Sequence, residues 1–196
     1  MTNNAITGAQ AAQAILDAGG VTNVRIERVS GFLSDHYDPS KKVLRLSPDV
    51  YDGRSISSVG VGAHEAGHAI QDKVKYPMLS LRTALVPSAS LGSNLSWIVI
   101  MAGFFMQMQG LIIAGIVLFS GVVLFQLVTL PVEFDASSRA KTLLFDSGVI
   151  SAPSERAGVA SVLNAAALTY VAAAISAIAT LIYFIIRSGL FGGSDD

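Results

Sequence analysis

The fold is organised around residues 63–69, which read AHEAGHA and contain two of the three histidines of the chain. His64, Glu65 and His68 form the pattern H-E-x-x-H. On a helix, His64 and His68 lie one turn apart on the same face, so both imidazoles can reach one tetrahedral Zn²⁺. Glu65 lies beside that face, where its carboxylate can accept a proton from a water that the metal activates. The alternative is a helix whose two histidines are structural, which requires the spacing and the intervening glutamate to be accidents.

Two long stretches without charge decide the class of protein. The chain has 196 residues, of which 52% are hydrophobic. No Asp, Glu, Lys or Arg occurs in residues 83–132 or 157–186. A bilayer requires uncharged stretches of that length, whereas a soluble core does not. The sequence therefore predicts a protein in contact with the lipid bilayer, with three transmembrane helices at about residues 85–106, 111–130 and 166–186.

The charged residues indicate which partners and which orientation to expect. The net charge is −1 and no basic stripe with interleaved aromatic residues is present, which argues against nucleic acid as a partner. The absence of cysteine excludes disulfides and thiolate metal ligands. Twelve of the 13 Lys and Arg lie in residues 1–82 or 131–156, and only Arg187 lies elsewhere. By the positive-inside rule, we expect the side that bears residues 63–69 to be cytoplasmic.

The residues that precede the histidines predict a small α+β part. Thr7 and Gln10 resemble a capping box that opens a helix, and Gly19 and Gly20 end it. Residues 24–47 alternate apolar and polar side chains and predict a short antiparallel meander, with strands at residues 24–29, 32–37 and 43–46. A free edge of such a sheet could accept an extended peptide as an added strand, or the meander could be purely structural.

A helix from about residue 55 to residue 72 carries the two histidines. Gly60, Gly62 and Gly67 each cost this helix about 1 kcal/mol relative to alanine, so tertiary packing must offset them. We therefore expect another backbone to lie close to the helix. Charged residues follow immediately at positions 72–75, which places the histidines outside the hydrocarbon and near the interface.

A catalytic zinc site with two histidines needs a third protein ligand. The topology favours Glu133, because two spans return the chain to the original side and Pro131 allows a new helix to begin there. In that helix, Glu133 and Ser137 share a face. Glu133 could instead be a first-turn acid that complements the helix dipole. The other candidates for the ligand are His36, Gln71, Asp72, Asp135, Asp146 and Glu155.

Four segments together resemble the YugP-type neutral zinc metallopeptidases of bacterial membranes, and the resemblance covers nearly the whole chain. The segments are LSDHYDP at 33–39, AHEAGHAIQ at 63–71, GSNLSW at 92–97 and LVTLPVEFDAS at 127–137. The EFDAS segment is also similar to the E-F-x-A-D segment of HtpX-type membrane proteases, in which the glutamate is the third zinc ligand.

The resemblance implies that His64, His68 and Glu133 bind zinc and that Glu65 is the general base. It implies a mostly helical protein with a zincin-like, gluzincin-type α+β catalytic domain, which residues 1–82 and 131–160 would form as one domain with the spans. Its expected location is the bacterial cell (inner) membrane, and its expected substrates are peptides or proteins, membrane proteins among them.

Two features depart from the related families. HtpX-type proteins have an aspartate where this chain has Ser137, and that acid commonly orients a ligand histidine. Ser137, Asp135 and Asp72 are the candidates for this role here. Members of the YugP-type family also tend to begin with an additional membrane helix, which this chain lacks.

Peptide hydrolysis also needs a donor for the oxyanion besides the metal. His36 and Tyr37 lie just before a turn and near the sheet edge that could accept substrate, so they have suitable reach. Arg139 is a further candidate. His36 could equally be an ordinary structural histidine.

Three functions fit these patterns. The first is a membrane-anchored zinc endopeptidase, a hydrolase in which Glu65 moves the proton. The second is a membrane scaffold or chaperone-like protein with a structural zinc site, closed by a fourth ligand such as His36 or Asp135. The third is an intramembrane protease of the site-two type, which requires the histidines to lie inside an apolar span and is disfavoured by the charges that follow Gln71.

Overall fold

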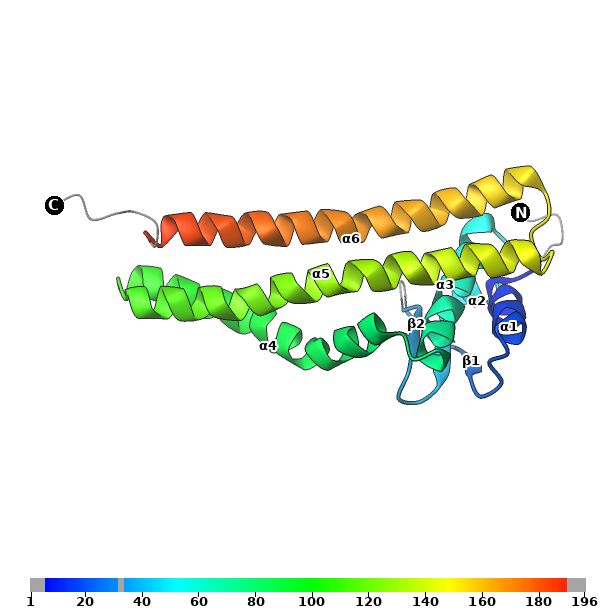
Figure 1. Cartoon of the computed structure of the whole chain (residues 1–196), viewed down its shortest axis with the longest axis horizontal. Coiled ribbons are helices and arrows are strands. Elements are labelled where there is room, and N and C mark those ends of the chain that lie inside the picture. The colour runs from blue at the N-terminus through cyan, green and yellow to red at the C-terminus, as the bar shows by residue number, and fades with distance from the viewer. Residues whose placement is uncertain (1–5, 32–33, 190–196) are drawn as a thin grey trace. The chain divides into compact units, whose positions relative to one another are not determined.

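The computed structural model describes residues 6–31 and 34–189. Within these residues the chain forms six helices and three strands (Figure 1). In chain order they are α1 (Gly8–Ala18), β1 (Arg25–Arg28), β2 (His36–Asp38), β3 (Val43–Leu46), α2 (Pro48–Tyr51), α3 (Ile56–Lys73), α4 (Pro77–Phe105), α5 (Gln109–Asp146) and α6 (Pro153–Arg187).

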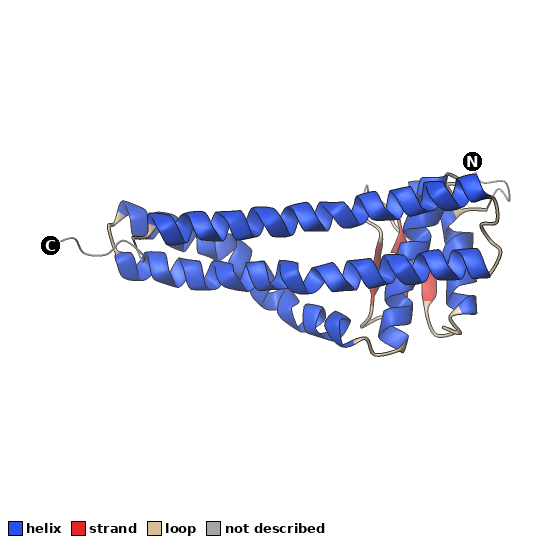
Figure 2. Ribbon diagram, turned by 45° about the horizontal axis from the view of Figure 1, so that its top comes forward, coloured by secondary structure: helices blue, strands red, loops and turns tan. Residues whose placement is uncertain are grey.

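The chain divides into two compact units, and the long helices α5 and α6 contribute residues to both. The first unit comprises residues 1–79 and 132–168, and the second comprises residues 80–131 and 169–196. The first unit contains all three strands, which Figure 2 shows in red among the helices of this unit.

The first helix begins with the predicted capping box. The Thr7 hydroxyl accepts a hydrogen bond from the Gln10 amide at 3.2 Å, and the Gln10 side chain accepts one from the Thr7 amide at 2.9 Å. Helix α1 ends at Gly19, as the sequence predicts. Its apolar face is buried in the core of the first unit, whose fully buried members include Ile15, Leu16, Leu44, Leu46, Val59 and Leu144.

The sheet differs from the predicted antiparallel meander. The strand order is β1-β3-β2, with β1 parallel to β3 and β2 antiparallel to β3. The second strand is also shorter than predicted and covers only His36–Asp38. Of the predicted strand at 32–37, residues 32 and 33 lie outside the described residues. The sheet is therefore mixed, with β3 in its centre.

A carboxylate in the connection supports the pairing of β2 with β3. Asp35 accepts hydrogen bonds from the Ser47 amide at 2.7 Å and from the Ser47 hydroxyl at 3.0 Å. These bonds hold the start of β2 beside the residue that follows β3, and β2 runs antiparallel along β3. Such a contact spans 12 positions in the sequence, and local alternation of apolar residues contains no information about it.

The sequence predicts that another backbone lies close to the glycines of α3, and this holds for two of the three. A Cβ atom added at Gly67 would lie 2.5 Å from the carbonyl oxygen of Ala136 in α5, and one added at Gly62 would clash with the carbonyl oxygen of Gly8. At Gly60 the nearest atom is in the side chain of Val162, at 3.4 Å, which is ordinary contact. Gly67 thus permits α3 and α5 to cross at backbone contact.

Pro131 does not begin a new helix, in contrast to the prediction. It lies inside α5, which continues for 38 residues from Gln109 to Asp146. Proline removes one backbone hydrogen bond, but helices with long apolar segments tolerate this loss because the neighbouring turns and packing maintain the helix. Val132, next to the proline, is completely buried. The second predicted span and the segment with Glu133 are consequently one helix.

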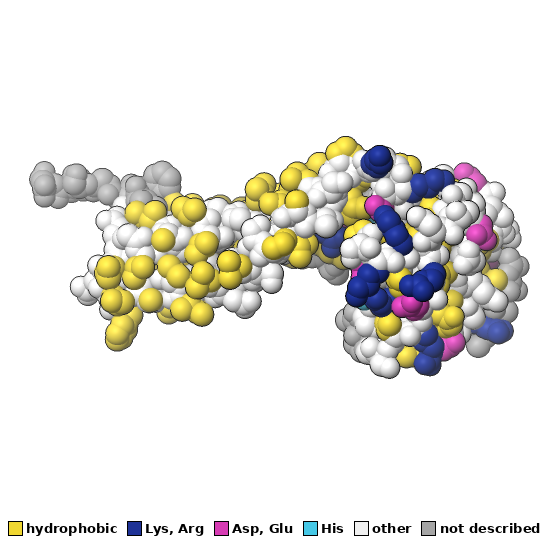
Figure 3. All heavy atoms as spheres, turned by 90° about the horizontal axis from the view of Figure 1, so that it is seen from below, with side chains coloured by type: hydrophobic (Ala, Val, Ile, Leu, Met, Phe, Trp, Pro, Cys, Tyr) yellow, Lys and Arg dark blue, Asp and Glu magenta, His cyan; other side chains and the backbone are white. Residues whose placement is uncertain are grey.

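Among the described residues, three helices are long and apolar enough to cross a membrane: α4 with 29 residues, α5 with 38 and α6 with 35. In the second unit their large apolar side chains are exposed, for example Ile98 at 66% and Phe105 at 92%. Figure 3 shows hydrophobic side chains spread over these helices, while the visible Lys, Arg, Asp and Glu gather on the first unit. Exposed apolar helices of this length are typical of membrane spans.

The contact at Gly67 predicts that Gly67→Ala destabilises the first unit. The added methyl group would force α3 and α5 apart, so we expect the free energy of unfolding to fall by about 1–3 kcal/mol. Gly60→Ala in the same helix is the matched control, because its methyl group meets only a side chain at ordinary distance and helix propensity favours alanine. Thermal unfolding in detergent, followed by circular dichroism, compares the two variants. Equal unfolding temperatures would contradict the inferred contact.

Candidate metal centre

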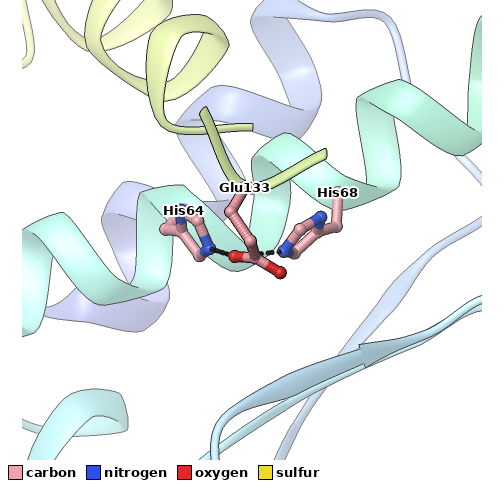
Figure 4. A group of neighbouring side chains, drawn as sticks. All are labelled: His64, His68 and Glu133. Atoms are coloured by element: carbon pink, nitrogen blue, oxygen red, sulfur yellow. Dashed lines mark hydrogen bonds and ion pairs between the residues drawn. The ribbon is translucent and has the colours of Figure 1, made fainter. Parts of the chain in front are cut away.

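Three side chains of the first unit converge on one point, His64 and His68 from α3 and Glu133 from α5 (Figure 4). The Oε2 atom of Glu133 lies 3.0 Å from Nε2 of His64 and 3.6 Å from Nε2 of His68. The two imidazole rings have centroids 4.8 Å apart and are nearly perpendicular, at 83°. Both rings thus present a nitrogen to the same carboxylate.

These positions suit a tetrahedral metal ion. One potential ligand atom from each of the three residues lies within 4.8 Å of the others. Tetrahedral zinc ligands at about 2.1 Å from the metal are about 3.4 Å from one another, close to the distances between the Glu133 oxygen and the two histidine nitrogens. Two imidazoles and one carboxylate are also a donor set that zinc accepts in catalytic sites.

Burial makes the charged carboxylate of Glu133 unfavourable unless a cation or hydrogen-bond donors lie close to it. Glu133 is only 1% exposed and His68 only 7% exposed. Burial alone would lower the pKa of His68, but the hydrogen bond to Glu133 and the charges of Glu65 and Glu133 outweigh it and raise that pKa. The same negative environment favours a metal cation between the three side chains.

Each histidine is held by a second contact through its other ring nitrogen. Nδ1 of His64 lies 3.1 Å from the hydroxyl of Ser137, and Nδ1 of His68 lies 2.9 Å from the side-chain oxygen of Gln71. Ser137, one of the sequence-based candidates for orienting a ligand histidine, thus contacts His64. Among the sequence-based candidates for orienting a histidine, Asp135 bonds to Gln71 and Asp72 belongs to a different network.

Gln71 is the residue whose place in the site sequence reasoning missed. The sequence suggested it only as a possible third ligand, whereas the structure places it behind His68. Its spacing of three residues from His68 puts the two side chains on one helix face, which is the signal that could have identified the contact. Asp146 and Glu155, which were further candidates for the third ligand, are not members of the cluster that the described residues form.

Glu65 is half-buried and follows the first histidine on α3. Its negative charge contributes to the raised pKa of His68, so the carboxylate acts electrostatically on the cluster without belonging to it. A role of Glu65 as the general base stays a prediction.

His36 and Tyr37 lie on β2 and bond to residues outside the cluster. The Tyr37 hydroxyl donates to Asp72 at 2.6 Å, and Asp72 also forms an ion pair with Lys42. Burial and the hydrogen bond to Asp72 raise the pKa of Tyr37. His36 contacts the Ser34 carbonyl oxygen at 2.8 Å through Nδ1. The network at Asp72 ties β2 to the end of α3, and a role of His36 or Tyr37 at the oxyanion stays a prediction.

Arg139, the remaining candidate donor for the oxyanion, lies one turn after Asp135 on α5. Its Nε atom donates to the Asp135 carboxylate at 2.6 Å. The guanidinium also lies over the ring of Tyr76, 6.0 Å from its centre. These contacts place Arg139 in a network behind the histidines.

Comparison with known proteins identifies the family of the chain. Residues 1–189 match the protein family described as "Putative neutral zinc metallopeptidase". The chain is also 48% identical over 179 residues to the "Putative membrane protease YugP" of Bacillus subtilis (strain 168). The matched residues are 91% of this chain and 79% of that protein. No solved structure matches the chain. The family resemblance of the four sequence segments is confirmed, and the chain belongs to the neutral zinc metallopeptidase family.

Proposed function

We propose that this protein is a zinc-dependent endopeptidase with a zincin-like, gluzincin-type catalytic part, in which His64, His68 and Glu133 hold the metal. The observation that carries the proposal is the convergence of these three side chains from two helices, one of which also bears Glu65 next to His64. Membership of a metallopeptidase family and similarity to a protein named as a membrane protease support it.

The chemistry follows from the donor set and from Glu65. A zinc ion in such a site supplies a Lewis acid that polarises a peptide carbonyl and lowers the pKa of water to about 7. Glu65 accepts the proton of the attacking water and passes it to the amine that leaves. Glu133 balances the cation with one negative charge and keeps both imidazoles turned toward it.

A structural zinc site in a scaffold or chaperone-like protein is less well supported. Structural sites are closed by four protein ligands, whereas catalytic sites use three. The cluster found among the described residues has three members. His36 and Asp135, the residues suggested as a fourth ligand, are bonded to Ser34 and to Gln71 and Arg139 respectively. The three-ligand set favours catalysis.

Peptide and protein substrates, membrane proteins among them, fit the proposed site. We assign the free side of β2 as the edge that takes an extended substrate, because the bond from Tyr37 to Asp72 connects this strand to the end of α3. A substrate strand would thus lie next to β2, the strand that is bonded to the end of the helix that bears the histidines.

We further propose that α4, α5 and α6 anchor the enzyme in the bacterial cell (inner) membrane with the histidines on the cytoplasmic side. Helix α3 is not among the helices that meet the length and composition of a span, in the part of the chain that the structure describes. This favours peptide hydrolysis outside the hydrocarbon over intramembrane proteolysis. The distribution of Lys and Arg supports the cytoplasmic orientation.

Glu65→Gln should retain zinc and lose proteolysis. The amide keeps the size of the side chain but cannot act as a base, so we expect cleavage of casein in detergent to fall about 10²–10⁴-fold. Zinc content, measured by mass spectrometry of the metal, should stay near one ion per chain. Cleavage at the wild-type rate by this variant would overturn the mechanism, and His64→Ala serves as a control that loses the metal itself.

Glu133→Gln should weaken zinc binding strongly. Changes to groups behind the ligands cost about 10–100-fold in metal affinity, so loss of a charged ligand should cost at least about 100-fold. Asp146→Asn on the same helix is the matched control, because it removes the same charge from an exposed position. Competition with a chromophoric chelator measures both affinities. A dissociation constant shared by the two variants would exclude Glu133 as a ligand.

A further inference from the structure

Gln71 is a completely buried side chain whose hydrogen-bonding groups are all in use. Its exposure is 0%. The amide nitrogen donates to the carbonyl oxygen of Val132 and to Oδ2 of Asp135, both at 2.8 Å. The amide oxygen lies 2.9 Å from Nδ1 of His68. One side chain therefore joins a proposed zinc ligand on α3 to two groups on α5.

The two groups on α5 dictate the orientation of this amide. The Val132 carbonyl and an ionised Asp135 carboxylate can only accept hydrogen bonds. Arg139 donates to Asp135 at 2.6 Å and stabilises its negative charge. If the amide were reversed, its oxygen would face two acceptors in a buried site, which is unfavourable. The oxygen of Gln71 must therefore face His68.

The orientation of the amide in turn dictates the tautomer of His68. An amide oxygen accepts hydrogen bonds and cannot donate, so Nδ1 of His68 must carry the hydrogen. The neutral imidazole then has its lone pair on Nε2, the nitrogen that lies 3.6 Å from Glu133 and faces the cluster. This is the atom that a metal ion would need.

The surroundings of His64 do not select one tautomer in this way. Its Nδ1 atom lies 3.1 Å from the hydroxyl of Ser137, and a hydroxyl can either donate or accept. Ser137 is thus compatible with both tautomers of His64. The two histidines differ in how strongly their surroundings select the form that binds a metal.

We propose that Gln71, oriented by the Val132 carbonyl and the Asp135–Arg139 pair, is a positioning residue that fixes the tautomer of His68 and presents its Nε2 atom to the metal. This inference rests on the proposed role of His68 as a zinc ligand. A purely structural tie between α3 and α5 would depend on bond number and packing, whereas a tautomer selector depends on which group accepts and which donates. The experiment separates these two roles.

The direct measurement is which ring nitrogen of His68 carries the hydrogen in the zinc-loaded protein, because Glu133 can also accept a hydrogen bond from Nε2 when no metal is bound. Histidine labelled with ¹⁵N gives three residues to assign, and the nitrogen chemical shifts identify which nitrogen of each ring carries the hydrogen. With zinc bound, we expect Nδ1–H on wild-type His68 and a mixture of the two forms in Gln71→Met. Nε2–H in wild-type His68 would overturn the proposal, whatever the variants do.

Zinc affinity tests the functional consequence. Gln71→Met keeps the length of the side chain but removes its hydrogen bonds, so the dissociation constant for zinc should rise about 10–100-fold. Gln13→Met, at an exposed glutamine of α1, is the matched control and should leave the constant unchanged. Unchanged affinity in Gln71→Met would contradict the proposal.

An exchange of donor and acceptor distinguishes selection of the tautomer from packing. Q71E alone places a carboxylate against Asp135, so it should weaken zinc binding at least as much as Gln71→Met. In Q71E/D135N the new amide can donate to the new carboxylate, whose other oxygen again accepts from Nδ1 of His68. Affinity should therefore recover in part relative to Q71E, although one carboxylate oxygen still faces the Val132 carbonyl. If the double variant folds with the same unfolding temperature as Q71E and stays equally weak, the proposal fails.

These measurements do not use proteolysis. A protein that binds zinc with the expected tautomer but cleaves no peptide would exclude the proposed endopeptidase and leave the role of Gln71 intact. Conversely, active protease with wild-type zinc affinity in Gln71→Met would exclude the role of Gln71 alone.

Discussion

The backbones of α3 and α5 touch at Gly67, and the cluster of proposed metal ligands depends on this contact. Any side chain at this position would meet the Ala136 carbonyl oxygen, which a Cβ atom would approach to 2.5 Å. Glu133 lies less than one turn before Ala136 on the same helix, so the crossing distance of the two helices also sets the distance from Glu133 to the histidines. A short carboxylate side chain can reach both imidazoles only when the backbones are this close.

The same crossing buries the charged carboxylate of Glu133, which is electrostatically unfavourable without positive charge nearby. It removes Glu133 from water, leaving 1% of the residue exposed, and places its carboxylate between His64 and His68. Packing alone would favour an apolar side chain at this position, because burial of a charge opposes folding. A metal ion between the three ligands would supply positive charge next to this carboxylate, so stability of the first unit and metal binding are linked. The site is thus part of the core of the unit that carries it.

The sequence predicts best those features that depend on neighbours in the chain. The capping box at Thr7 and the close packing at Gly62 and Gly67 follow from local propensity. The strand order does not, because β1 pairs in parallel with β3 and not with β2, and the alternation of apolar residues does not reveal which strands pair. Pro131 misled the prediction for a related reason, since a rule for isolated helices gives way to packing in a long apolar helix.

Convergence of Glu133 with the two histidines was inferred from topology, whereas the support behind them was not. The group beside Nδ1 of His64 is only a hydroxyl, that of Ser137. An acid is nevertheless present two positions before Ser137. Asp135 bonds to Gln71, and Gln71 bonds to His68, so this acid acts on the other histidine through an amide. Placing the amide between acid and imidazole keeps a second negative charge out of direct contact with His68, beside which Glu65 and Glu133 already act. Arg139 compensates the charge of Asp135 on its far side. Asp135 thus orients the Gln71 amide, and the amide oxygen offers His68 an acceptor as a carboxylate would. The full negative charge of Asp135 stays out of contact with the cluster.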